Sequence, residues 1–145
     1  MLNIDKDFYP NNLKMAHLRV GIVGVGQMGA AVAANLLRNK VPVGLFDLAG
    51  DKNVPEVLKP GISTATWAES SASLASKSDV IITALPKPEH VSAAFDSPGG
   101  ILEGIQPGAT WIEHSTTDFQ NTLRIKDNVE AKQAQAIEAP LTGGM

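Results

Sequence analysis

The chain has 145 residues, a net charge of −3, 43% hydrophobic and 19% charged residues, and no cysteine. This length fits one domain, and the composition is that of a soluble folded protein. An acidic chain lacks the basic surface that nucleic-acid binding needs, and no apolar run reaches the roughly 20 residues of a membrane-spanning helix. Without cysteine, disulfides, thiolate metal sites and a cysteine nucleophile are excluded.

The first sixteen residues have no apolar core and carry charges of both signs, unlike a secretory signal or a transit peptide. We expect residues 1–16 to be a poorly ordered leader and residues 17–145 to form the folded domain. With no targeting signal, a cytoplasmic location and no membrane partner are expected.

Short apolar runs alternate with helical stretches along the rest of the chain. The expected strands are 18–23, 43–47, 62–65, 79–85, 110–113 and 136–139, and the expected helices are 30–39, 71–77, 89–95 and 117–132. Residues 48–60 predict a loop or short helix, and Pro98-Gly99-Gly100 predicts a break. The alternation predicts an α/β, Rossmann-type fold with a doubly wound, mainly parallel sheet, whose ligand crevice lies at the carboxyl ends of the strands.

A glycine-rich loop, Gly24-x-Gly26-x-x-Gly29, follows the first expected strand and opens a helix. The first glycine allows a tight turn, the second lets the backbone approach a pyrophosphate, and the third lets the helix pack close to the strand. The free N–H groups at the start of the helix then bind the anion. A glycine turn in a domain that binds no nucleotide is the alternative.

Asp47 ends the second expected strand, about 20 residues after the loop, where a carboxylate accepts a hydrogen bond from a ribose 2′-hydroxyl. The same carboxylate repels a 2′-phosphate, so NAD is the favoured cofactor. Lys52 lies close enough in sequence to keep NADP as an alternative. A solvated strand end is the alternative role of Asp47.

Residues 22–29 read Ile-Val-Gly-Val-Gly-Gln-Met-Gly, and Asn35-Leu36 follow on the same helix. This stretch resembles the opening signature of the β-hydroxyacid dehydrogenases, which include 3-hydroxyisobutyrate dehydrogenase and glyoxylate/succinic semialdehyde reductase. Their cofactor domain is the 6-phosphogluconate dehydrogenase NAD(P)-binding domain. Three later segments are similar to family motifs in the same order: 81–86 to a strand ending in Leu-Pro, 113–116 to Asp-x-Ser-Thr, and 138–144 to Asp-Ala-Pro-Val-Ser-Gly-Gly.

The resemblance implies hydride transfer between a nicotinamide dinucleotide and a small 3-hydroxy acid or semialdehyde. The expected cofactor contacts are Gly24, Gly26, Gln27, Met28, Gly29, Asp47, Leu85, Pro86, His90 and Thr116, and the expected contacts to a substrate carboxylate are Thr142, Gly143 and Gly144. His90 stands where the family often has Asn, so a surface helix position is its alternative. Thr116 could instead cap the helix that follows.

The family's C-terminal helical domain, which carries its catalytic lysine, is absent from these 145 residues. We therefore expect a truncated form with no catalytic residue in this chain, incomplete for turnover alone unless a second copy in a homo-oligomer completes the site. The alternatives are a stand-alone, non-catalytic dinucleotide-binding module and an imine-reductase-like member. No His/Glu cluster has metal-ligand spacing, so no metal site is predicted.

Overall fold

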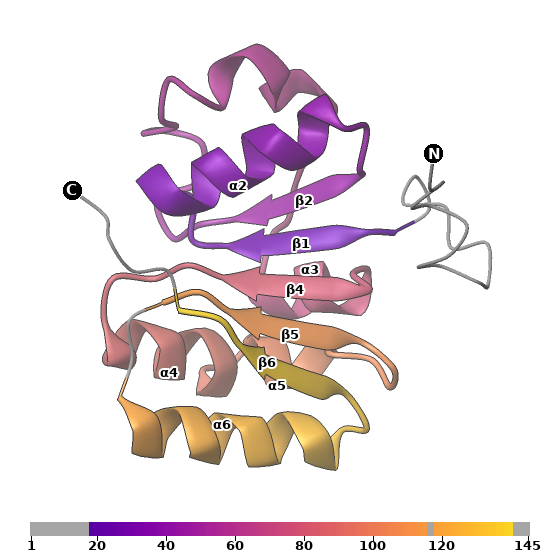
Figure 1. Ribbon diagram of the computed structural model, residues 1–145, viewed down its shortest axis with the longest axis vertical. Helices are drawn as coiled ribbons and strands as arrows, with labels where there is room; N and C mark the ends of the chain where they lie inside the picture. The colour runs from indigo at the N-terminus through magenta and orange to yellow at the C-terminus, as the bar shows by residue number, and fades with distance from the viewer. Residues whose placement is uncertain (1–17, 116–117, 141–145) are drawn as a thin grey trace, which may run out of the picture.

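A computed structural model of the chain describes residues 18–115 and 118–140. Within these ranges six strands form one sheet in the order β3-β2-β1-β4-β5-β6, with every neighbouring pair parallel (Figure 1). The strands are β1 (Val20–Val23), β2 (Val43–Phe46), β3 (Thr66–Trp67), β4 (Val80–Thr83), β5 (Thr110–Glu113) and β6 (Gln135–Glu138). This strand order confirms the predicted Rossmann-type fold, with a sheet that is wholly parallel.

Helices lie on both faces of the sheet. They are α2 (Gln27–Arg38), the 3-10 helix η2 (Lys59–Thr64), α3 (Ser71–Ser76), α4 (Pro88–Asp96), α5 (Ile101–Gly104) and α6 (Phe119–Ala131). Helix α2 packs on the face formed by β1 and β2, whereas α3 to α6 pack on the other face. The labelled strand arrows in Figure 1 point the same way, and since every neighbouring pair is parallel the carboxyl ends gather at one edge.

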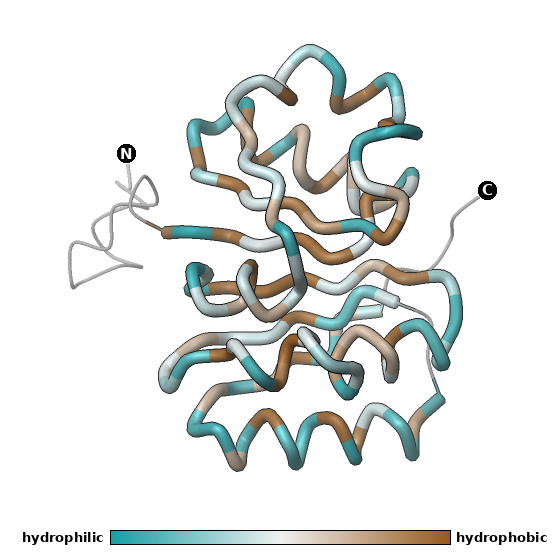
Figure 2. Tube along the Cα trace, turned by 180° about the vertical axis from the view of Figure 1, so that it is seen from behind, coloured by the Kyte–Doolittle hydropathy of each residue, from teal (hydrophilic) through white to brown (hydrophobic). Residues whose placement is uncertain are grey.

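Two separate cores hold these layers together. On the α2 side, Ile22 and Leu45 of the sheet meet Ala30 and Ala33 of the helix, all of them fully buried. The small alanines let α2 approach the strands closely. On the other side, Trp111 packs edge-on against Phe95 with ring centroids 4.6 Å apart. Figure 2 shows the corresponding hydrophobic colouring along the strands and its alternation with polar residues on α6.

One predicted strand is wrong. Most of residues 62–65 lie in η2, and the third strand follows it at Thr66–Trp67. Pro60 at the start of η2 fixes a helical φ, and the Thr64 hydroxyl donates to the Gly61 carbonyl oxygen at 2.8 Å. These local interactions outweigh the β-propensity of the Ile-Ser-Thr run.

Helix boundaries also differ from the sequence expectations. Helix α2 begins at Gln27, inside the Gly24–Gly29 motif and three residues before the expected start, and α6 begins at Phe119 instead of residue 117. The Asp118 carboxylate caps α6 by accepting the Asn121 N–H at 3.1 Å. Helix α5 was not expected because its four residues are too few to give a helical pattern.

Candidate cofactor site

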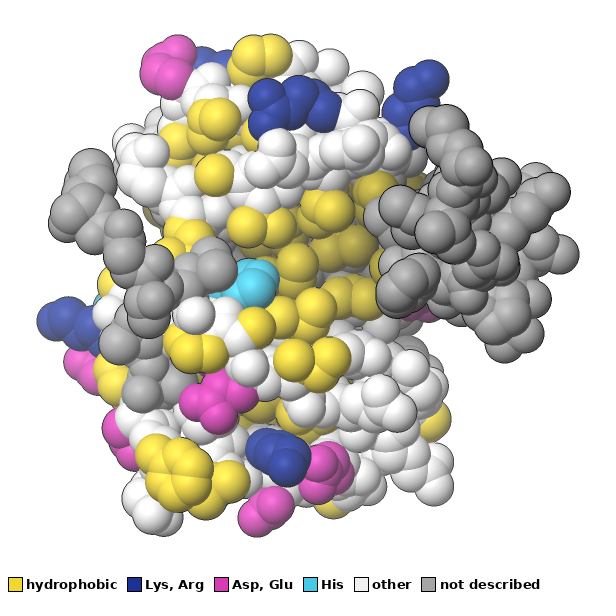
Figure 3. Space-filling view, viewed as in Figure 1, with side chains coloured by type: hydrophobic (Ala, Val, Ile, Leu, Met, Phe, Trp, Pro, Cys, Tyr) yellow, Lys and Arg dark blue, Asp and Glu magenta, His cyan; other side chains and the backbone are white. Residues whose placement is uncertain are grey.

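A cavity of about 730 Å³ opens at the carboxyl edge of the sheet. Its walls come from the glycine loop, the residues after β2, the turns after β4 and β5, and helix α4 with the loop that follows it. In Figure 3 hydrophobic side chains gather across the middle of the molecule, with a histidine among them. The strand order reverses between β1 and β4, which is the place where open α/β sheets bind their ligands.

The three glycines of the loop meet different surroundings. Gly24 has φ +97°, and a Cβ there would lie 2.3 Å from the Ala84 carbonyl oxygen. A Cβ on Gly29 would lie 1.8 Å from the Gly24 carbonyl oxygen, so helix and loop touch. Around Gly26, by contrast, nothing lies within 4 Å of the Cβ position, and this residue lines the cavity. Of the three, Gly26 alone has open space at its Cβ position.

The start of α2 is open as well. Gly26 is the N-cap residue and supplies no side-chain hydrogen bond to the first turn. Helix N–H groups that lack intrahelical partners carry partial positive charge and attract anions. The loop thus has both the room and the electrostatics for a phosphate group.

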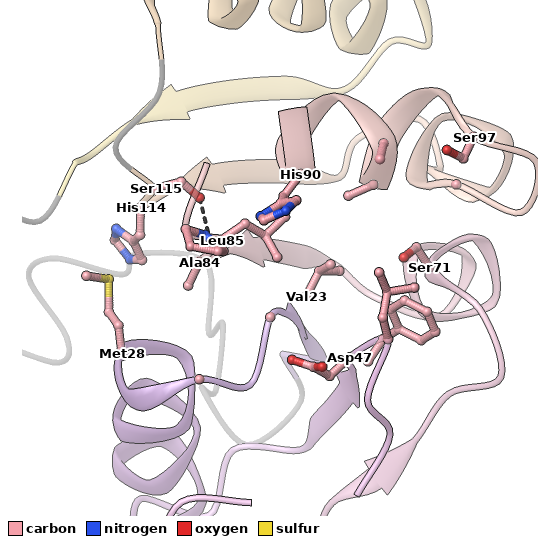
Figure 4. Close-up of a pocket in the computed structure, with 18 of the residues that line it drawn as sticks. Val23, Met28, Asp47, Ser71, Ala84, Leu85, His90, Ser97, His114 and Ser115 are labelled. Carbon is pink, nitrogen blue, oxygen red and sulfur yellow. Dashed lines mark hydrogen bonds between the residues drawn. The ribbon is translucent and has the colours of Figure 1, made fainter. Parts of the chain in front are cut away.

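Asp47 follows β2 and faces the cavity, half-buried (Figure 4). Its Oδ2 accepts the N–H of Val25 at 2.8 Å, inside the glycine loop, and its Oδ1 accepts the N–H of Ala49 at 2.9 Å. This link to the loop was not expected from the sequence. Each carboxylate oxygen keeps a further lone pair, so Asp47 can still accept from a ligand hydroxyl.

The opposite wall is built from the turns after β4 and β5. The Ser115 hydroxyl oxygen accepts the Leu85 N–H at 2.8 Å, the bond drawn dashed in Figure 4. The backbone N–H of His114 donates to the Thr83 carbonyl oxygen at 2.9 Å. The His114 Nδ1 lies 2.6 Å from the Ala139 carbonyl oxygen, so this nitrogen carries the proton and donates. Pro86, also on this wall, has no N–H to offer.

Below this wall lies Glu113, the last residue of β5, with 1% of its surface exposed. Its Oε1 accepts the Ser115 N–H at 2.6 Å, whereas Oε2 has no hydrogen-bond partner among the described residues. Burial raises the pKa of Glu113 above its ordinary value of 4.5, and the neighbouring hydrogen-bonding groups of Ser115 and Thr83 partly offset that rise. From the sequence, this residue was expected only to open the 113–116 motif.

The far end of the cavity was also missed. It is formed by α3 and α4 and the loop after α4, through Ser71, Ala93, Ala94, Ser97, Pro98, Gly99 and Gly100. The Gly99 carbonyl oxygen accepts the Ala72 N–H at 2.8 Å, which joins this loop to the start of α3. The Pro-Gly-Gly break was visible in the sequence, but only the fold brings it to the same cavity as the glycine loop.

Most of the predicted cofactor contacts lie together in the cavity wall. Those that line it are Gly24, Gly26, Gln27, Met28, Asp47, Leu85, Pro86 and His90. Gly29 does not line it but packs beneath the loop. Thr116, Thr142, Gly143 and Gly144 lie outside the described residues, as does the expected leader 1–16.

Across residues 18–115 and 118–140, no helix is both long and apolar enough to cross a membrane. In the same ranges no three His, Asp or Glu side chains gather in a group able to hold a metal ion.

Residues 19–145 match the family described as the NAD binding domain of 6-phosphogluconate dehydrogenase. The chain belongs to this family. It is 32% identical over 127 residues to 2-(hydroxymethyl)glutarate dehydrogenase of Eubacterium barkeri, a match that covers 88% of this chain and 41% of that protein. The chain therefore spans well under half of this relative.

Solved structures agree with this assignment. Mycobacterium tuberculosis 3-hydroxyisobutyrate dehydrogenase, solved with L-serine, superposes with a TM-score of 0.73 at 25% identity, covering 88% of this chain and 41% of that one. Psf3, solved in complex with NADP+ and 2-OPP, gives a TM-score of 0.74 at 25% identity, covering 86% and 43%. The resemblance to the β-hydroxyacid dehydrogenases is thus confirmed.

Proposed function

We propose that the cavity binds a nicotinamide dinucleotide, with NAD preferred over NADP, as the cofactor domain of a β-hydroxyacid dehydrogenase-type oxidoreductase. The proposal rests above all on one juxtaposition: Gly26, with open space at its Cα, and the Asp47 carboxylate line the same cavity. One offers room and N–H groups to a pyrophosphate, and the other offers an acceptor to a ribose.

The residues of the cavity fit the parts of such a cofactor. Gly26 and the free N–H groups at the start of α2 would hold the pyrophosphate. Asp47 would accept a hydrogen bond from the adenosine ribose. The far end, with Ala94 and Ser97 in its wall, supplies mixed apolar and hydroxyl surface for an adenine ring.

Preference for NAD follows from charge. A 2′-phosphate placed at Asp47 would meet a carboxylate whose two oxygens are already held toward the cavity wall by Val25 and Ala49. The carboxylate therefore cannot turn away from the phosphate without losing both bonds. Leu48, the next residue, is 94% exposed and offers the phosphate no charge.

The nicotinamide of a bound cofactor would donate or accept the hydride. Met28 and His114 face each other across the cavity near the glycine loop and would border that end (Figure 4). Thr116, Thr142, Gly143 and Gly144 are proposed to complete the pocket for a small 3-hydroxy acid or semialdehyde. Because the chain covers 41% of its hydroxymethylglutarate relative, turnover is proposed to require residues outside this chain.

Isothermal titration calorimetry of the wild-type chain, with NAD and with NADP in separate titrations, tests the proposal. We expect saturable binding of one dinucleotide per chain, tighter for NAD. Binding of neither dinucleotide would refute the cofactor assignment, and tighter binding of NADP would refute the role of Asp47. AMP and ADP-ribose serve as partial ligands that separate the adenosine contacts from the nicotinamide contacts.

A further inference from the structure

We propose that Glu113 is a positioning residue for the cofactor cavity, and that it acts through Ser115 to hold the turns after β4 and β5 in their binding arrangement. Glu113 itself does not line the cavity. The inference rests on the proposed function, because the ligand that this arrangement would bind is the dinucleotide.

Two hydrogen bonds in series make the connection. Glu113 Oε1 accepts the Ser115 N–H at 2.6 Å, and Ser115 Oγ accepts the Leu85 N–H at 2.8 Å. Glu113 ends β5, whereas Leu85 follows β4, so the pair of bonds spans two neighbouring strands. Both Ser115 and Leu85 line the cavity (Figure 4). Displacing Ser115 would therefore release the Leu85 backbone at the cavity wall.

The nearby oxygen atoms of Thr83 already accept hydrogen bonds from other N–H groups. The Thr83 hydroxyl, beside Glu113 on β4, accepts the Trp111 Nε1–H at 2.8 Å, and the Thr83 carbonyl oxygen accepts the His114 N–H. Among the described residues, the Ser115 N–H thus has the Glu113 carboxylate as its acceptor.

The setting of Glu113 is costly for folding, which argues against a role in packing alone. Its side chain is 1% exposed, and Oε2 lacks a hydrogen-bond partner among the described residues. A buried carboxyl group with an unmatched oxygen lowers stability, whereas an apolar side chain would avoid that penalty but leave the Ser115 N–H without its acceptor. Perturbed buried groups of this kind concentrate at functional sites.

The decisive variant is Glu113→Met, which keeps an unbranched side chain of similar length but removes the acceptor. We expect its thermal midpoint to stay close to that of the wild type, because relief of the buried carboxyl group offsets the loss of the acceptor for the Ser115 N–H. The Kd for NAD should rise about threefold to tenfold, the loss that corresponds to one hydrogen bond. Glu113→Asp should bind NAD within about twofold of the wild type, since Asp readily accepts the N–H two residues ahead. The exposed Glu130→Met on α6 is the matched control and should change neither property.

Coupling to Ser115 distinguishes positioning from general damage. Ser115→Ala should weaken NAD binding about as much as Glu113→Met, and the double variant should be no weaker than either single variant. Wild-type affinity in the Glu113→Met variant, or losses that multiply in the double variant, would overturn the inference.

Amide hydrogen exchange at Leu85 and Ser115, measured without cofactor, tests the connection from Glu113 to Leu85 independently of NAD binding. Exchange at both amides should accelerate in Glu113→Met, and exchange at Leu85 should accelerate in Ser115→Ala. If the wild type binds no NAD but these amides respond as stated, the cofactor proposal fails while the connection itself stands. Unchanged exchange in both variants would overturn the connection, and Ser115→Ala still tests it should Glu113→Met fail to fold.

Discussion

Two strand-end carboxylates hold opposite walls of the same cavity, and they differ in what they face. Asp47 binds the Val25 N–H of the glycine loop, is half-buried and lines the cavity. Glu113 binds the Ser115 N–H after β5, is buried and has an unmatched Oε2. The same bond to a backbone N–H thus serves two purposes: Asp47 can meet a ligand in the cavity directly, whereas Glu113 reaches this cavity only through Ser115.

The two carboxylates also differ in the free energy that their surroundings cost the folded state. Asp47 has both oxygens in hydrogen bonds and keeps contact with solvent, so its charge is well supported. Glu113 is enclosed, and its raised pKa records the penalty that burial places on its charge. Variants that act on one wall and spare the other test whether the two carboxylates differ in this way.

The largest effect is expected from the loop that Asp47 holds. In Gly29→Ala the new Cβ would lie 1.8 Å from the Gly24 carbonyl oxygen, so the helix and loop must separate. We expect a loss of more than about 3 kcal/mol in the free energy of unfolding, at or beyond the upper end for overpacking. Chemical denaturation measures this loss. Gly61→Ala is the control, because its Cβ meets only Leu37 side-chain atoms at 3.5 Å and 3.6 Å; equal stability of the two variants would contradict the packing described.

Gly26→Ala should separate binding from folding on the same wall. Its Cβ would meet nothing within 4 Å, so the unfolding free energy should stay close to that of the wild type. The methyl group would occupy the space proposed for the pyrophosphate, and we expect NAD affinity to fall about tenfold or more. Titration calorimetry beside thermal denaturation gives both values. Retained affinity would place the pyrophosphate elsewhere.

Asp47→Ala should weaken both dinucleotides, because it removes the anchor of Val25 as well as the ribose acceptor. The loss should be larger for NAD than for NADP, since NADP is also relieved of repulsion. Asp47→Asn keeps an acceptor for one N–H, so the affinity lost by both cofactors should be smaller than in Asp47→Ala. The preference for NAD over NADP should still fall, because the negative charge is gone. Parallel Kd measurements for the two cofactors test this, and a loss confined to NADP would contradict the assignment.

The wall held by Glu113 should show its own pH dependence. A folded-state pKa above 4.5 means that the folded protein binds more protons than the unfolded chain between that value and the raised pKa. This group therefore makes stability fall as the pH rises through that window. Glu113→Gln should flatten this part of the curve of unfolding free energy against pH. A wild-type curve that runs parallel to the variant curve from pH 4 to pH 8, a range of about four units around ordinary and raised Glu values, would contradict the shift.

The smallest effect is expected at the opposite edge of the sheet, where Asp79 binds the backbone N–H of Arg19 at 2.9 Å and its guanidinium at 3.2 Å. These bonds lower the pKa of Asp79, so its contribution is present above the ordinary value of 3.8 and is lost as the pH falls through the folded-state value. Both side chains are largely exposed, and the contribution is small. Asp79→Asn should lower the thermal midpoint slightly and leave NAD affinity unchanged; a change in affinity would show that the two edges are coupled.

How much the sequence could reveal depended on whether a residue acts within one local segment. The Gly24–Gly29 spacing and the position of Asp47 after a strand follow from the chain itself, and the structure brings them to one cavity. The apolar runs around β1, β4 and β5 likewise predicted the parallel sheet. The prediction of a strand at 62–65 was wrong because Pro60 and the hydrogen bond of the Thr64 hydroxyl favour a 3-10 helix. Neither effect can be seen in the hydrophobic pattern.

Contacts between strands were beyond reach of the sequence. The role of Ser115 depends on the register that sets Thr83 beside Glu113, which brings the two following turns together. The far wall at Ser97 and Gly99 depends equally on the packing of α3 against the loop after α4. Neither pairing leaves a periodic or spacing signal in a single chain.

An NMR titration of the isotopically labelled wild-type chain with NAD, monitored through its backbone amide resonances, tests directly whether the two walls bind one dinucleotide. We expect saturable shifts at Val25 and Gly26 on one wall and at Leu85 and Ser115 on the other, with one shared Kd, and weaker binding when NADP replaces NAD. Shifts confined to one wall, or none at either, would contradict a dinucleotide site built between the two carboxylates.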